Sequence, residues 1–136
     1  MTIKSPYDYP RANTDRQLVA ASTAATVAAS TTLMWWVVPR DLRVKAVKFV
    51  NEVAFGVSGS NFWRVRVLRY VAGNYSSDIV DRGSDSAAIS TLTAFDGGTP
   101  ASTTVVAGDV LRIAVDKIGS PANLVNPSIV VEWEPV

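Results

Sequence analysis

The chain is predicted to be an all-β protein, a two-sheet β-sandwich of the jelly-roll type that carries an extended N-terminal arm. Two observations predict this class. Apolar and polar residues alternate along several short segments, as where Leu111, Ile113 and Val115 alternate with Arg112 and Asp116. About seven or eight such segments fall within roughly a hundred residues, separated by turn-forming residues, and this spacing is typical of a sandwich.

Residues 105–117 show the pattern most clearly. Ala107-Gly108-Asp109 predicts a tight turn, because glycine tolerates positive φ and aspartate bonds the nearby backbone. The apolar pair Val105 and Val106 is expected to form a strand that pairs with the one after the turn. The final strand repeats the alternation, with Ile129, Val131 and Trp133 facing the core.

Three earlier strands are predicted at residues 31–38, 42–54 and 62–71. In the second of them the alternation changes phase between Lys45 and Lys48, which predicts a β-bulge near Ala46. That bulge would restore three apolar residues to one side, namely Val44, Val47 and Phe49. In the third strand the residues expected to face the core are Trp63, Val65 and Val67.

The middle of the chain is less regular. Residues 77–81 favour a short strand followed by a turn. Residues 87–95 have apolar side chains at helix-like spacing but also β-branched ones, so helix and strand both remain open there.

Two regions are predicted, an extended N-terminal arm at residues 1–30 and the sandwich domain at 31–136. Residues 20–32 are almost all Ala, Ser or Thr, a composition compatible with a strand or with a segment that orders only on binding. The arm has little bulky apolar surface, so we expect its removal to leave a folded domain but weaken partner binding. Its expected anchors are Tyr7, Tyr9, Leu18 and Val19.

Composition narrows the class of function. The chain has no histidine and no cysteine, so the commonest general base and the commonest zinc ligands are missing. Its 13 basic and 12 acidic residues give a net charge of +1, which provides no field to attract nucleic acid or an anionic membrane. The longest strongly apolar run, residues 33–38, is too short to span a bilayer. We therefore expect neither nucleic acid nor membrane as a partner.

The residues that carry chemistry form no catalytic or metal-binding pattern. The spacing of Asp78, Asp81 and Asp85 is not that of a calcium loop, so they are interpreted as turn residues, and no metal or cofactor is expected. Asp109 fits hairpin formation better than acid catalysis. The arginines at 64, 66 and 69 are interpreted as a solvated face, or as cross-strand partners of Glu132 and Glu134, rather than a nucleic-acid stripe.

Trp35 and Trp36 are the most distinctive pair. Adjacent residues of a strand point to opposite faces, so one indole is predicted to lie in the core and the other outside. An exposed indole serves either as a sugar-stacking platform or as an anchor in a protein interface. We favour the interface, because no ring of polar sugar-binding residues accompanies it.

Three stretches, residues 44–51, 105–111 and 129–133, make the chain resemble the small jelly-roll virion proteins of tailed bacteriophages that decorate or cement the capsid. The resemblance covers residues 31 to 134 and rests on the order of strands and on the Ala-Gly-Asp-Val-Leu turn and strand. It implies a homotrimer on the outer surface of the virion, bound to the major capsid protein, with the N-terminal arm crossing the lattice. Related jelly rolls also occur in head fibres and tails.

The residues and the resemblance together predict a non-enzymatic structural protein, made in the host cytoplasm, that stabilises a phage capsid. The alternative is a carbohydrate-binding or receptor-binding module of a head fibre or tail.

Overall fold

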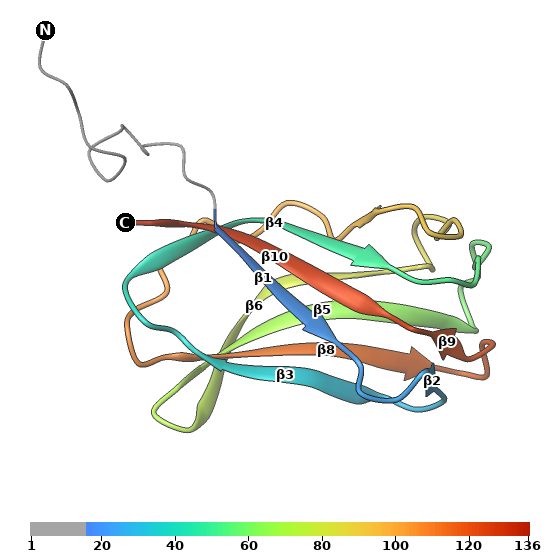
Figure 1. Ribbon diagram of the computed structural model, residues 1–136, viewed down its shortest axis with the longest axis horizontal. Helices are drawn as coiled ribbons and strands as arrows, with labels where there is room; N and C mark the ends of the chain where they lie inside the picture. The colour runs from blue at the N-terminus through green and yellow to red at the C-terminus, as the bar shows by residue number, and fades with distance from the viewer. Residues whose placement is uncertain (1–15) are drawn as a thin grey trace, which may run out of the picture.

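Residues 16–136 are described in the computed structural model of the chain, and they form two packed β-sheets with no helix (Figure 1). The first sheet contains β1 (Arg16–Ala21), β10 (Ser128–Pro135), β4 (Leu42–Val50) and β7 (Phe95–Asp96), in that order. The second sheet contains β3 (Thr31–Val37), β8 (Val110–Ile118), β5 (Phe62–Val71) and β6 (Asn74–Gly83), in that order. A small separate ladder joins β2 (Thr26–Val27) to β9 (Leu124–Val125). The predicted all-β sandwich is confirmed.

The first half of the chain pairs with the second half in nested order. β5 pairs with β6, β4 with β7, β3 with β8, β2 with β9 and β1 with β10, and every pair is antiparallel. Two more antiparallel ladders, β10 with β4 and β8 with β5, complete the sheets. The chain reverses between β5 and β6 at Ala72 and Gly73, which have φ of 49° and 83°. Positive φ at both central residues is what a two-residue hairpin turn of type I′ requires.

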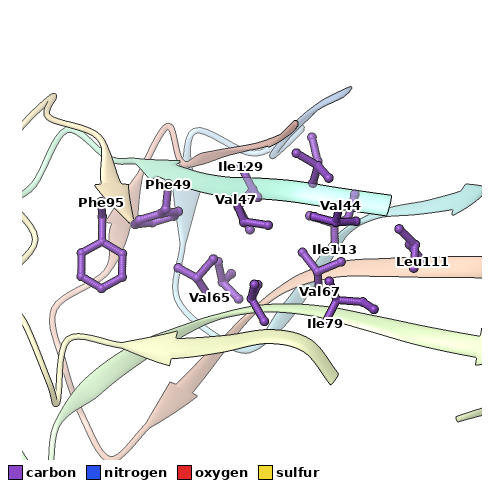
Figure 2. Packing of buried hydrophobic residues seen from close by; sticks show 14 of the residues in the cluster. Val44, Val47, Phe49, Val65, Val67, Ile79, Phe95, Leu111, Ile113 and Ile129 are labelled. Carbon is purple, nitrogen blue, oxygen red and sulfur yellow. The ribbon is translucent and has the colours of Figure 1, made fainter. Parts of the chain in front are cut away.

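The core lies between the two sheets. Alternate residues of each strand face inward, so the labelled side chains of the two layers point toward one another in Figure 2. The predicted inward residues Trp63, Val65 and Val67 are fully buried, as are Leu111, Ile113 and Val115. The indole N–H of Trp63 donates a hydrogen bond of 2.8 Å to the carbonyl of Ala122, so this large side chain is buried without an unpaired polar group.

The predicted bulge in β4 is confirmed. Glu132 of β10 pairs with Ala46 while Trp133 pairs with Val44, so Lys45 is the additional residue in β4. The bulge lets the strand change phase, and Val44, Val47 and Phe49 are all buried as a result.

The predicted partner of β8 was wrong. The turn before β8 is present, with Gly108 at φ 92° and the Asp109 N–H donating to the Val106 carbonyl. Val105, however, pairs with Leu42 and not with β8. Both edges of β8 are already taken by β3 and β5, which leaves no edge for a local hairpin partner.

Two central segments also differ from expectation. The strand predicted at residues 77–81 extends over the whole of β6 and carries two register shifts against β5. Residues 87–95 form neither a helix nor a full strand: Ile89 makes one isolated bridge with Phe55, and β7 begins only at Phe95. The apolar spacing of this segment reflects a loop whose Ile89 side chain fills the core.

The sandwich begins earlier than residue 31, so the expected arm at 1–30 was too long. β1 adds to the outer edge of β10, with Ala20 fully buried and Leu18 packed against the core. β2 contributes the buried Val27. Ala20 and Ala21 lack a strong local preference for a strand, and pairing with Ile129 and Ser128 of β10 decides their conformation. The expected anchors Tyr7 and Tyr9 lie outside the described residues.

We predict that deleting residues 1–21 destabilises the domain relative to deleting residues 1–15, because only the longer deletion removes β1. Loss of the buried contacts of Ala20 and Leu18 and of the ladder to β10 should cost about 2 to 4 kcal/mol, which lowers Tm by roughly 10 °C. Thermal unfolding followed by circular dichroism measures the difference. Equal melting temperatures for the two truncations would show that β1 contributes nothing to the fold.

Candidate functional site

The face of the second sheet that points away from the core carries four rows of side chains in register. Three rows cross β3, β8, β5 and β6 in that order, namely Val37–Val110–Tyr70–Tyr75, Trp35–Arg112–Leu68–Asp78 and Thr32–Ala114–Arg66–Asp81. The fourth row crosses only β8, β5 and β6, and consists of Asp116, Arg64 and Gly83. We call Trp35, Val37, Tyr70, Tyr75 and Arg112 the aromatic end, and Arg64, Arg66, Asp78, Asp81 and Asp116 the ionic end. The aromatic end adjoins the β5–β6 hairpin, which projects at the lower left of Figure 1.

The aromatic end is an exposed apolar surface whose rings hold one another in place. Trp35 packs edge-on against Tyr70 with ring centroids 5.2 Å apart, and Tyr70 packs edge-on against Tyr75 at 6.0 Å. Trp35, Val37 and Tyr75 nevertheless remain 55%, 64% and 56% exposed. The two edge strands of the sheet, β3 and β6, thus present three large apolar side chains to solvent on the same face, and the ring of Tyr70 on β5 lies between Trp35 and Tyr75. Such a surface is typical of an interaction site.

The two tryptophans point to opposite faces, as predicted, and Trp35 is the outward one. Trp36 lies opposite Leu111 and packs against Trp133, with ring centroids 5.7 Å apart. Trp36 therefore belongs to the interior of the sandwich and is not available as an anchor.

The ionic end is a network in which every charge has an opposite partner. The Arg64 guanidinium binds the Asp81 carboxylate, and Arg66 Nη1 lies 2.9 Å from Asp116. Arg66 Nη2 lies 3.5 Å from Asp78. Burial lowers the pKa of Arg66, but the hydrogen bond to Asp116 and the neighbouring carboxylates outweigh it and hold that pKa above its ordinary value. These charges fix β5, β6 and β8 to one another and leave no free acid or base.

The expected partners of the arginines were wrong. Glu132 and Glu134 lie on β10 in the first sheet, where Glu132 accepts a hydrogen bond from Gln17 and Glu134 lies 3.7 Å from Lys45. Two of the actual partners, Asp78 and Asp81, lie on β6, which is longer than the strand predicted at residues 77–81. Asp78 and Asp81 consequently lie in a strand rather than in turns, and residues 16–136 contain no acidic cluster that could hold a metal ion.

Asp109 has a structural position at the end of the sandwich beside the aromatic end. Its carboxylate accepts hydrogen bonds from Arg69 Nε at 2.8 Å and from the Val106 N–H at 3.0 Å. Arg69 Nη2 lies 2.7 Å from the same oxygen, and both side chains are largely buried. The pair ties β5 to the turn before β8, which explains Asp109 without catalysis.

Elsewhere an open depression of about 400 Å³ lies between the first sheet and β6 of the second, beside Lys45, Arg82 and Asp96. The Arg82 guanidinium donates to the Asp96 carbonyl at 2.8 Å and stacks on Phe95. Lys45 lies near Glu134. Both cations of this depression thus already interact with neighbouring groups.

The structure does not bring the predicted anchors together. Leu18 packs inward, whereas Val19 is 54% exposed on the outer face of the first sheet, away from Trp35 on the second. Tyr70, Tyr75 and Arg112 were not predicted as neighbours of Trp35. The period-two alternation places Tyr70 and Arg112 outward, but only strand order reveals that they adjoin Trp35.

The chain matches no family model and no curated protein. Among solved structures it has a likeness to a chain in the structure of the infectious bursal disease virus Gx strain, with 16% identity and a TM-score of 0.21. The match covers 87% of this chain and 30% of the viral chain. A likeness at this TM-score carries no argument about function.

We predict that Asp109→Ala destabilises the domain by about 3 kcal/mol, because it leaves the largely buried Arg69 charge and the Val106 N–H without their acceptor. Asp109→Asn should cost less, since its amide oxygen can still accept from Val106. Urea unfolding of both variants tests this order. An alanine variant within about 0.5 kcal/mol of the parent would mean that the pair contributes little to stability.

Proposed function

We propose that the protein is a non-enzymatic virion structural protein that decorates the outer surface of a phage capsid and stabilises it, docking through the aromatic end of its second sheet. The observation that carries this proposal is the exposed group of Trp35, Val37 and Tyr75, on a face whose other end is fully charge-paired. Interface hot spots are enriched in Trp, Tyr and Arg, and the aromatic end combines all three.

The strand order supports the narrower jelly-roll assignment within this proposal. In such a fold a long antiparallel hairpin wraps so that its strands divide between two four-stranded sheets. Here β1, β10, β4 and β7 form one sheet, and β3, β8, β5 and β6 form the other. The nested pairs β1–β10 and β4–β7 lie in the first sheet, and the pairs β3–β8 and β5–β6 lie in the second.

The rigidity of the docking face also supports a cementing role. Cross-strand ion pairs join β5 to both of its neighbours, and the Arg69–Asp109 pair closes the adjacent end of the sandwich. A preorganised surface loses less conformational entropy on binding than a flexible loop does. In this proposal the major capsid protein is the partner, and the decoration protein binds as a homotrimer.

The segment before β1 supplies the arm in this proposal. Tyr7 and Tyr9, which lie outside the described residues, are its expected anchoring side chains.

The alternative, a carbohydrate-binding module of a fibre or tail, has one observation in its favour: the exposed Tyr75 donates a hydrogen bond of 2.8 Å to the carboxylate of Asp78, on the same face as the exposed Trp35. Two features favour a protein partner instead. The rings meet at interplanar angles of 70° and 74°, so they form no flat strip for a sugar chain, and the Arg112 guanidinium covers one face of Trp35.

We predict that the protein is present in hundreds of copies per purified particle, because a cementing protein occupies repeated lattice sites. Quantitative mass spectrometry against the major capsid protein gives the ratio. A count of a dozen or fewer would exclude the decoration role and favour the fibre or tail alternative.

A further inference from the structure

Arg112 differs from the other arginines on the outer face of the second sheet. Arg64 and Arg66 each contact aspartates of neighbouring strands. Within residues 16–136, Arg112 has no carboxylate within salt-bridge distance, although its side chain is half-buried among apolar neighbours. The nearest acidic side chain in its row, Asp78, already accepts hydrogen bonds from Tyr75 and Arg66. The aromatic end therefore carries one uncompensated positive charge.

The guanidinium of Arg112 is nevertheless held in a defined position. Its Nε donates a hydrogen bond of 2.7 Å to the hydroxyl of Thr32, and its Cζ lies 5.8 Å from the centroid of the Trp35 ring. Its two terminal nitrogens make no hydrogen bond to the described part of the chain. A guanidinium fixed at Nε presents these two nitrogens as a pair, the geometry that binds one carboxylate through two parallel hydrogen bonds.

We propose that the partner of the aromatic end presents an Asp or Glu carboxylate to the terminal nitrogens of Arg112, beside an apolar side chain that packs on Trp35 and Val37. This inference rests on the proposed docking function and names the chemistry of the partner's surface. A free anion would satisfy only the guanidinium, and a purely apolar partner would bury its charge without compensation. A protein surface with an acidic residue next to an apolar one satisfies both.

The test uses a yeast-displayed library of random heptapeptides, selected in parallel on the full-length protein and on its Trp35→Ala, Arg112→Gln and Arg43→Gln variants. Arg43 is an exposed cation on β4 of the first sheet, so its variant makes the same charge change away from the aromatic end. Circular dichroism first establishes that all four proteins are folded.

We expect the full-length protein and the Arg43→Gln variant to enrich peptides with Asp or Glu next to Leu, Ile, Phe, Tyr or Trp. The Trp35→Ala variant should enrich none of these, and the Arg112→Gln variant should lose the preference for an acidic residue. For one selected peptide, changing Glu to Gln or Asp to Asn should weaken binding to the parent protein by about tenfold or more. The same change should have little effect with Arg112→Gln, since the charge pair is then already lost.

The outcomes separate this inference from the proposed function. Enrichment of apolar peptides without an acidic position would overturn the carboxylate inference and leave the docking surface standing. Equal enrichment on the parent and on Trp35→Ala, or none on either, would contradict the docking surface and the inference together. The copy number in particles is independent of both results.

Discussion

The fold depends on one reversal of the chain, the turn at Ala72 and Gly73. All five nested strand pairs, from β5–β6 out to β1–β10, bring together segments that flank this turn at increasing distance along the chain. A type I′ turn matches the right-handed twist of the strands it joins, and so it sets the geometry of the innermost pair. Ala72 adopts the left-handed region in spite of its Cβ, at a cost of about 1 kcal/mol. The strand pairing around the turn offsets that cost.

Local patterns in the sequence were sufficient to predict the strands whose two faces differ most. β10 alternates between buried and less buried residues over most of its length, and β5 and β8 do so over their first residues. The phase change around Ala46 correctly indicated a bulge. The patterns were insufficient where pairing rather than alternation determines the structure. β1 is a short strand of mostly exposed residues whose conformation depends on the free edge of β10, and Val105 pairs with Leu42 because β8 has no free edge. Whether a strand has a free edge, as β10 does for β1 and β8 does not for Val105, cannot be recognised before the strand order is known.

The candidate site shows the same limit. The sequence predicts that one of two adjacent tryptophans faces outward, but not that Trp35 is the one, nor that Tyr70, Tyr75 and Arg112 surround it. These residues come from four strands, and β3, β8 and β5 are neighbours only because the chain wraps into two sheets. The ionic end arises in the same way. Its arginines stand on β5 and its aspartates on β6 and β8, so a segment that looks basic in the sequence is neutralised in the fold.

In the proposed function, the aromatic end of the second sheet is the surface by which the protein docks. A cryo-EM map of the assembled particle, with the sandwich fitted into the density outside the capsid shell, measures this orientation directly. We expect Trp35, Val37 and Tyr75 to face the capsid surface and to be covered by it. A map in which these side chains point to solvent while another face of the sandwich contacts the shell would contradict it.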